Sequence, residues 1–283
     1  AVFPFHFWQP DFHAAATTPV SAMLSSVVVK LGVYGFLRMT TLLFVQQAPM
    51  IGSLLVGLGI VGVVYGGLGA IGTHNAKRML AYSTLAQVGF ILVAIGWGTP
   101  LALAAAVIFT FNHSLVKSAM LMLAGVVASR APVKTASFEV VQGLGKYMPA
   151  AGALFLAGGL ALAGIPPTNG FISKMTLFES GIQAEQWWSL LLLGLASIFT
   201  LIYVVRSYMR IWWQPVVGFS YGATTYAAAE VKAKPGGDRL LAPALLIASA
   251  LLLGLWPAPL VNLATAVSQW LGNPAAYIAA VLN

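Results

Sequence analysis

Residues 104–125, AAAVIFTFNHSLVKSAMLMLAG, form an apolar run that is long enough to cross a bilayer as one helix, and the run carries His113 and Lys117 near its middle. Lys30 and Lys174 lie in similar apolar runs, and none of the three lysines has an acidic residue within four positions. An ammonium group at the centre of a bilayer costs from about 3 to more than 10 kcal/mol. The sequence therefore favours a protein that moves charge through a membrane.

The composition is that of an integral membrane protein. Of the 283 residues, 59% are hydrophobic and only 7% are charged, whereas soluble domains carry about 25% charged residues. Apolar runs of about 20 residues, rich in Leu and Ala, indicate transmembrane helices rather than a β-barrel, so we expect an all-α polytopic fold. The net charge of +8 is scattered through loops and apolar runs, which does not favour a nucleic-acid partner.

The sequence offers nothing that would hold a cofactor or a metal ion. The chain has no cysteine, which excludes disulfides and thiolate metal sites. Nucleotide-binding, zinc-protease and haem-attachment motifs do not occur in it. We therefore expect no cofactor and no metal site in this sequence.

The apolar runs predict about seven membrane spans. The fifth is too long for one straight helix and is interrupted by GIPPTNG at 164–170, whose two prolines remove backbone donors. Residues 1–18 are expected to form a cytoplasmic loop ahead of the bundle, and residues 263–283 an apolar tail along the membrane surface. The predicted spans, which make up a bundle over 19–262, are 19–45, 51–73, 79–98, 101–129, 147–183, 187–213 and 240–262.

Basic residues in the loops predict the orientation. The loops after the second, fourth and sixth spans contain lysine and arginine, whereas those after the first, third and fifth contain neither. By the positive-inside rule, the N-terminal end of this multi-pass protein lies in the cytoplasm and the C-terminal end outside the plasma or bacterial inner membrane. The first residues, AVFPFHFWQPDFH, include neither an initiating methionine nor a signal peptide, so we expect further sequence upstream.

The buried bases are spaced as a proton relay requires. Lys30 lies about eleven residues, or ~16 Å, into its predicted helix, which is too deep for its ammonium to reach water. His113 and Lys117 are spaced i, i+4 and share one helix face, so a proton can pass between them through a single water. A lone intramembrane histidine also serves as a contact between helices, but the lysine one turn away favours proton transfer.

Lys174 follows the GIPPTNG break by four residues. Irregular backbone at membrane depth survives where it is buried in protein or lines a hydrated cavity, and broken helices occur at transporter ion sites. A plain proline kink is the alternative, which the adjacent lysine disfavours. Glu179, five residues after Lys174, is either a partner or exit-side carboxylate or else an interfacial charge.

Other charged residues have simpler interpretations. Arg206 and Arg210 lie where the sixth span meets the cytoplasm, and we interpret them as topology anchors. His6, Asp11 and His13 precede the first span. One carboxylate and no fourth ligand argue against a metal site there, which leaves a proton antenna or a structural loop contact.

Four segments resemble one family in the same order. They are FHFWQPDFHAAATTPVSAMLSSVVVKLGVYGFLR, NAKRMLAYSTLAQVGF, FNHSLVKSAMLMLAG and GIPPTNGFISKMTLF. The chain resembles the antiporter-like proton-translocating membrane subunits, which include subunits of respiratory complex I, of membrane-bound hydrogenases and of Mrp-type cation/proton antiporters. It is most similar to the Mrp D subunit, through NHSLVKS, YMRIWW and the tail from Asn273 to Leu282, although Asn273 stands where that family has aspartate.

The resemblance implies roles for the bases. A full subunit of that superfamily has about fourteen helices of ~20 residues each, and this chain matches the last seven. Lys30 then corresponds to the eighth-helix lysine that links two half-channels, and His113 and Lys117 to the eleventh-helix pair. Lys174 corresponds to the lysine of the broken twelfth helix. The family's fifth-helix glutamate and seventh-helix lysine would lie upstream of Ala1.

The resemblance also implies an activity. We expect a proton-translocating subunit of a multisubunit Na⁺ or K⁺/proton antiporter, which would act with other membrane subunits in a lipid bilayer. Within the superfamily, the alternative is a pumping subunit of complex I or of a membrane-bound hydrogenase, driven by redox chemistry. Outside it, the alternative is a structural membrane subunit whose charges are vestigial.

Overall fold

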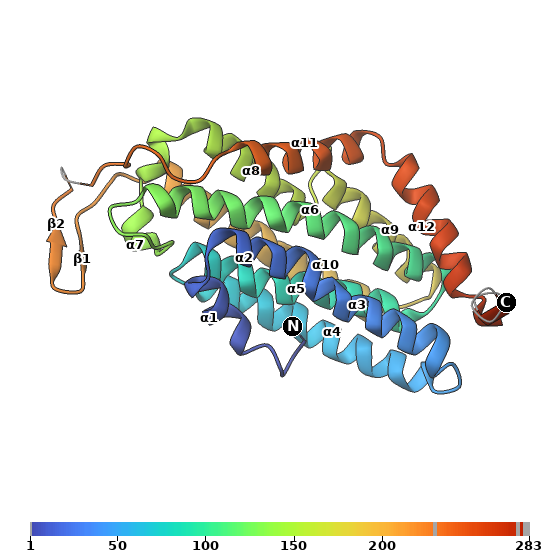
Figure 1. Ribbon diagram of the computed structural model, residues 1–283. Helices are drawn as coiled ribbons and strands as arrows, with labels where there is room; N and C mark the ends of the chain where they lie inside the picture. The colour runs from blue at the N-terminus through green and yellow to red at the C-terminus, as the bar shows by residue number, and fades with distance from the viewer. Residues whose placement is uncertain (1, 229–230, 276–277, 280–283) are drawn as a thin grey trace.

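The computed structural model describes residues 2–228, 231–275 and 278–279, which form a bundle of helices lying side by side (Figure 1). The first long helix, Thr18–Leu43, includes two π-helical turns, η1 and η2. The helical elements in chain order are α1 (Trp8–Ala15), α2 (Thr18–Met23), η1 (Leu24–Val28), α3 (Val29–Arg38), η2 (Met39–Leu43), α4 (Ala48–Gly72), α5 (Ala76–Trp97), α6 (Pro100–Arg130), α7 (Phe138–Val141), η3 (Leu144–Tyr147), α8 (Pro149–Ala163), α9 (Asn169–Gln183), α10 (Trp187–Tyr208), η4 (Met209–Trp213), α11 (Leu241–Leu255) and α12 (Ala258–Leu271).

Within the described residues, five helices are long and apolar enough to cross a membrane: Thr18–Leu43, α4, α5, α6 and Trp187–Trp213. The pair formed by α11 and α12 raises this number to six if it is one bent span. The protein is therefore a multi-pass, all-α membrane protein. The long predicted span 147–183 is two helices, α8 and α9, separated by non-helical residues.

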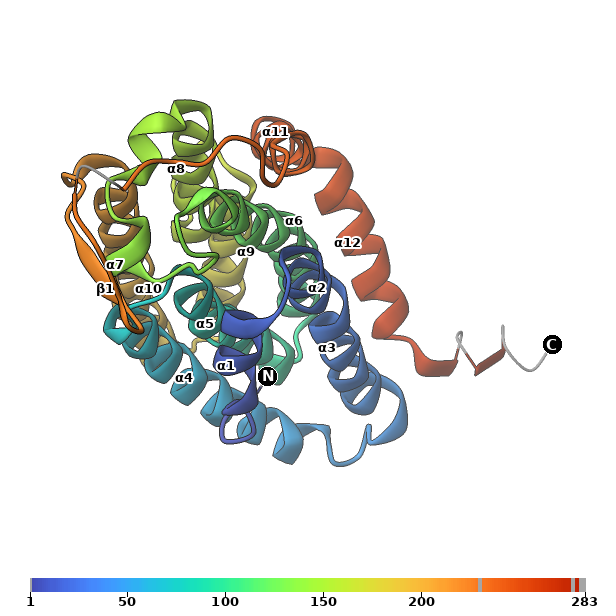
Figure 2. The same ribbon diagram turned by 60° about the vertical axis from the view of Figure 1, so that its left-hand side comes forward.

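The centre of the bundle is formed by α5 and α6, which other helices surround (Figure 2). Nearly all of α5 is buried, and it packs closely on α4 through facing glycines. A Cβ at Gly52 would lie 2.5 Å from the Gly96 carbonyl oxygen, and one at Gly59 would lie 2.7 Å from that of Gly89. Small residues let the two backbones approach this closely, which is how helices associate in lipid without a hydrophobic driving force.

The break between α8 and α9 has a local cause. Gly164 ends α8 with φ +81°, a conformation that side chains rarely adopt. Pro166 and Pro167 follow, and neither can continue the helical hydrogen bonds. α9 then packs so closely against α8 that a Cβ at Gly170 would collide with the Ala161 carbonyl.

The C-terminal helices differ from the predicted single span over 240–262. α11 ends at Leu255, and after Trp256 and Pro257 the chain bends by 80° into α12. The predicted span therefore covers α11 and the first residues of α12, a second helix that packs against α6. The predicted surface tail begins within α12, and its residues 276–277 and 280–283 lie outside the described residues.

One end of the bundle carries a β-hairpin, and we call it the hairpin end (Figure 1). Strands β1 (Phe219–Tyr221) and β2 (Thr224–Tyr226) pair antiparallel within the longest loop. At this end Arg206 donates to the Ile71 carbonyl, and the Arg210 guanidinium lies 5.5 Å from the centre of the Phe138 ring. Both arginines thus hold α10 and η4 to neighbouring segments.

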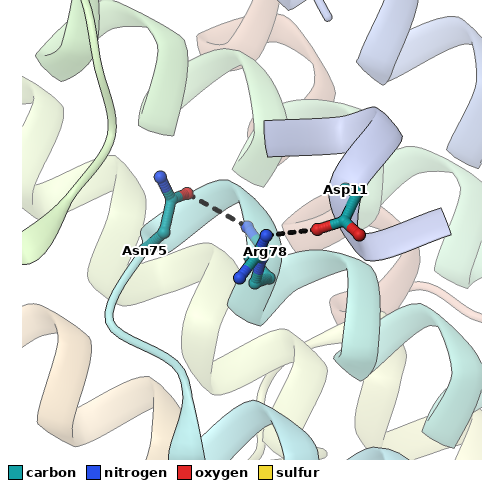
Figure 3. A network of polar contacts seen from close by, with 3 residues as sticks. All are labelled: Asp11, Asn75 and Arg78. Carbon is teal, nitrogen blue, oxygen red and sulfur yellow. Dashed lines mark hydrogen bonds and ion pairs between the residues drawn. The ribbon is translucent and has the colours of Figure 1, made fainter. Parts of the chain in front are cut away.

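A polar network fastens α1 to α5 at the hairpin end (Figure 3). Asn75 caps α5, since its side-chain oxygen accepts hydrogen bonds from the backbone of Lys77 and Arg78. The Arg78 guanidinium pairs with Asp11 of α1. Both side chains of this pair are substantially exposed, so it contributes at most about 1 kcal/mol.

Candidate functional site

The four predicted bases are buried on three helices, and we call Lys30, Lys117, His113 and Lys174 the buried row. Their exposed fractions are 8%, 0%, 4% and 8%. Lys30 is on α3, His113 and Lys117 are on α6, and Lys174 is on α9. α6 packs against η1 and α3, which brings Lys30 near the helix that carries His113 and Lys117.

Lys30 lies just after the π-helical turn η1. Its Nζ donates a 2.5 Å hydrogen bond to the Ser25 carbonyl oxygen in that turn. π-Helical turns inside α-helices occur frequently at functional sites. Here the turn supplies a backbone acceptor to an ammonium that has no carboxylate partner among the described residues.

Hydroxyl groups on α5 connect Lys30 to Lys117. Ser25 Oγ lies 3.0 Å from Thr84 Oγ1, and either atom can donate. The neighbouring Ser83 Oγ accepts a hydrogen bond from Lys117 Nζ, which also donates to the Leu80 carbonyl oxygen at 3.0 Å. Thr84 Oγ1 and Lys117 Nζ both donate to the Leu80 carbonyl oxygen, so buried hydroxyls and backbone carbonyls line the space between the two lysines.

A small cavity lies between His113 and Lys174. Its volume is about 10 Å³ for the centre of a water-sized sphere, enough for about one water, and Gln87, Asn112 and Ser173 also line it. Both nitrogens of His113 lack a hydrogen-bond partner among the described residues. Water in this cavity would give His113 a partner and extend the row toward Lys174.

The break in the helix creates the environment of Lys174. Its Nζ donates to the Ala163 carbonyl oxygen at 2.8 Å, at the C-terminal end of α8, where the helix dipole stabilises a positive charge. The same Nζ lies 5.4 Å from the centre of the Phe90 ring, which adds a cation–π contact. Nearby, Asn112 Nδ2 donates to Ser173 Oγ at 2.8 Å and to the Asn169 carbonyl oxygen at 3.0 Å, which ties α6 to α9.

Glu179 is not brought into this row. It is exposed on α9, and the one ion pair found among the described residues joins Arg78 to Asp11. The charges of the row are therefore balanced by carbonyls, hydroxyls, a ring and a helix dipole. Charges without counter-ions repel one another strongly in a medium of low dielectric constant.

His6, Asp11 and His13 also fail to form one cluster. Asp11 pairs with Arg78, while the His6 ring packs against Phe3 and Tyr65 with centroids 5.6 and 4.7 Å away. The three side chains make separate contacts, and the described residues include no cluster of three or more His, Cys, Asp or Glu side chains that could hold a metal ion.

Sequence reasoning missed the polar side chains of α5 as part of the site. Ser83, Thr84 and Gln87 were included only as part of the segment NAKRMLAYSTLAQVGF, which resembles the family. Their signal is hydroxyl and amide groups at i, i+1 and i+4 in an otherwise apolar helix, which places them near one face. Ser25 and Ser173 give no such signal, since isolated serines are common in membrane helices.

A multi-pass bundle with a broken helix and a row of buried bases is the arrangement of an antiporter-like membrane subunit. Residues 1–200 match the model of the NADH:quinone oxidoreductase/Mrp antiporter transmembrane family, and the chain belongs to that family. The likeness to the Mrp D subunit, predicted from the sequence, is confirmed by an antiporter relative and by a solved Mrp complex.

Three relatives show how far this likeness extends. The chain is 30% identical to the D subunit of a Na⁺/H⁺ antiporter of Bacillus subtilis, over 100% of this chain and 55% of that protein. It is 37% identical to an NAD(P)H-quinone oxidoreductase chain 4 of a Synechococcus strain, over 62% of this chain and 33% of that protein. A protein chain in the solved Mrp complex of Dietzia sp. superimposes with a TM-score of 0.89 at 25% identity, covering 100% of this chain and 59% of that one. The chain thus spans less than two thirds of the length of each of these relatives.

Proposed function

We propose that this chain is part of the proton-translocating subunit of a multisubunit Na⁺ or K⁺/proton antiporter. The observation that carries the proposal is the buried row, whose bases have hydroxyls and a water-sized cavity between them rather than counter-ions. A structural subunit would have no reason to keep three uncompensated ammonium groups, since each is costly at membrane depth.

In the proposed mechanism, protons step between neighbouring bases. Lys30 and Lys117 exchange protons along the hydroxyls of Ser25, Thr84 and Ser83, with water joining the gaps between these groups, and Lys117 and His113 lie one helical turn apart. His113 and Lys174 exchange a proton through water in the cavity between them. Because the charges repel, a proton that arrives at one base favours release from the next.

The antiporter assignment is supported by the likeness to the Bacillus subtilis antiporter protein over the whole chain and by the TM-score of 0.89 with a protein chain of the Mrp complex. A redox-enzyme relative, the F(420)H(2) dehydrogenase subunit N of Methanosarcina mazei, is 34% identical over 93% of this chain, so a vesicle assay is needed to separate the two. A second candidate, a pumping subunit of a quinone oxidoreductase, is favoured by the 37% identity to an oxidoreductase chain over 62% of this chain. In either case we propose that the hairpin end faces the cytoplasm, because the basic loops lie there.

The two candidates predict different results in vesicles. We expect the purified complex, reconstituted with a pH-sensitive dye inside, to change the internal pH when a Na⁺ or K⁺ gradient is imposed without any electron donor. Comparing the two cations identifies the one that is exchanged. A pH change that instead requires a reductant and a quinone would favour the redox-driven pump.

The hydroxyl bridge on α5 gives a smaller test. Ser83→Ala removes the side-chain partner of Lys117, and a hydrogen bond to a charged group contributes about 1.5–3 kcal/mol. We expect the exchange rate in vesicles to fall about tenfold. Ser53→Ala is the matched control, since Ser53 is exposed on α4 and bonds only to the Pro49 carbonyl. Equal rates in the two variants would contradict the bridge.

A further inference from the structure

Tyr203, on α10, is a buried polar group that the proposed relay does not use. It is among the largest fully buried side chains of the protein, with 1% of its surface exposed. Its hydroxyl oxygen is buried as well and has no hydrogen-bond partner among the described residues. A buried hydroxyl is costly unless it is bonded in some state of the protein, so its presence here calls for an explanation.

The register of two helices places Tyr203 opposite Ser83. α5 begins at the hairpin end and α10 ends close to it, so the two helices run antiparallel where they pack together (Figure 1). A hydrogen bond of 3.4 Å from Gln87 Nε2 to Thr200 Oγ1 joins them. Tyr203 is three residues, or ~4.5 Å, beyond Thr200. Ser83 is four residues, or ~6 Å, before Gln87, so both are about one turn nearer the hairpin end.

Polar side chains surround the Tyr203 hydroxyl without bonding to it. Ser83 and Gln87 of α5 and Thr200 of α10 all lie near its oxygen, but none meets it with the distance and angle of a hydrogen bond. A small movement of the tyrosine ring or of a neighbouring hydroxyl would complete one. The hydroxyl is therefore available for a bond that only some states of the site require.

Ser83 has one bonding position left for such a partner. Its hydroxyl donates to the Leu80 carbonyl oxygen at 3.0 Å, and its oxygen accepts a hydrogen bond from Lys117 Nζ. A hydroxyl oxygen carries two lone pairs, so the second lone pair of Ser83 can accept from Tyr203 Oη. Ser83 thus lies between the tyrosine and the central lysine of the buried row.

Loss of the Lys117 proton reverses the hydrogen bond between Lys117 and Ser83. An ammonium nitrogen only donates, whereas the neutral amine has a lone pair that needs a donor. Ser83 can supply that donor by turning its hydroxyl from the Leu80 carbonyl to Lys117 Nζ. A hydroxyl that accepts a hydrogen bond donates more strongly in turn, because chains of hydrogen bonds polarise one another. A bond from Tyr203 to Ser83 therefore stabilises the neutral form of Lys117.

We propose that Tyr203 is a positioning residue for proton release from Lys117: its hydroxyl donates to Ser83 Oγ, and Ser83 donates to the neutral amine. The inference rests on the function proposed above, since it assigns a role within the relay. The proton that leaves Lys117 passes along the row to the next base, while Tyr203 keeps its own. Tyr203 thus acts through Ser83 and carries no proton itself.

Tyr203→Phe tests this role because it removes the hydroxyl and keeps the ring. We expect the exchange rate of the reconstituted complex to fall about fivefold, on the scale of one neutral hydrogen bond. The melting temperature is expected to hold or rise, since the hydroxyl that is removed has no partner at rest. A purely structural residue would instead lower the rate and the melting temperature together.

Tyr208→Phe is the matched control for this variant. Tyr208 is on the same helix, and its ring stacks on Trp212 with centroids 5.5 Å apart. It is five residues beyond Tyr203, which places it on another face of α10. We expect the Tyr208→Phe complex to exchange at the native rate.

A double-mutant cycle shows whether Tyr203 acts through Ser83. Ser83→Ala removes the hydroxyl that Tyr203 is proposed to polarise, so adding Tyr203→Phe to it should cause no further loss. If the two residues acted independently, the single losses of about tenfold and about fivefold would multiply to about 50-fold.

A native rate in Tyr203→Phe, or losses that multiply in the double variant, would overturn the positioning role. A slower rate accompanied by a lower melting temperature would overturn it too, in favour of packing. If Lys117→Met is inactive in any of these cases, the relay stands and only the role of Tyr203 is wrong. If Lys117→Met exchanges at the native rate, the proposed function itself is wrong.

Discussion

Lys117→Met is expected to abolish exchange in reconstituted vesicles. Lys117 is fully buried and is the central member of the row, bonded to Ser83 and to the Leu80 carbonyl. Methionine fills a similar volume but holds no proton, so the relay is interrupted between Lys30 and His113. Loss of an obligatory proton-transfer group costs about 100-fold or more in rate, and the pH-sensitive dye inside the vesicles would measure it.

Lys146→Met is the matched control for this variant. Lys146 is exposed in the short helix η3 at the hairpin end and is not part of the row. We expect the Lys146→Met complex to exchange at the native rate. Removing the buried ammonium of Lys117 also removes a desolvation cost, so Lys117→Met should assemble and melt at or above the native temperature. An assembled Lys117→Met complex that exchanges at the native rate would refute the relay.

Gly170→Ala is expected to have the largest effect on stability. An added Cβ would collide with the Ala161 carbonyl, where α9 crosses α8, and neither backbone can move without disturbing the break. Overpacking of this kind costs about 1–3 kcal/mol or more. The same shift would separate Lys174 from the Ala163 carbonyl, so thermal stability and exchange should fall together.

Gly57→Ala provides the control for that substitution. Gly57 lies in α4, and a Cβ there meets no atom within 4 Å. Alanine is favoured over glycine in a helix by up to about 1 kcal/mol, so the melting temperature should stay level or rise. If the Gly170→Ala protein melts at the same temperature as the Gly57→Ala protein, the close approach of α8 and α9 is not rigid.

Much of the fold could be predicted from local chemistry. Apolar runs of bilayer length give helices because an unpaired backbone group in lipid is too costly. The break at 164–170 followed from two prolines beside glycines, and the structure places it between Ala163 and Asn169. The bend after Leu255 was not predicted, because Trp256 and Pro257 lie in an otherwise uniform apolar run. The 80° angle between α11 and α12 depends on how both helices pack on α6.

The candidate site divides in the same way. Lys30, Lys117, His113 and Lys174 could be identified from the sequence alone, because a charged or titratable group stands out in an apolar run. Glu179 is only five residues from Lys174 in the sequence, yet its side chain is on the exposed side of α9. A spacing of five residues does not return a side chain to the same helix face.

The sequence by itself determined which groups carry charge into the membrane and where the fifth span breaks. Those facts depend on single residues and their near neighbours. Only the tertiary structure decided that Ser25, Thr84 and Ser83 lie between two lysines, and that His113 and Lys174 line one water-sized cavity. These relations join residues on different helices, and their distances depend on how closely the helices pack, which no local pattern encodes.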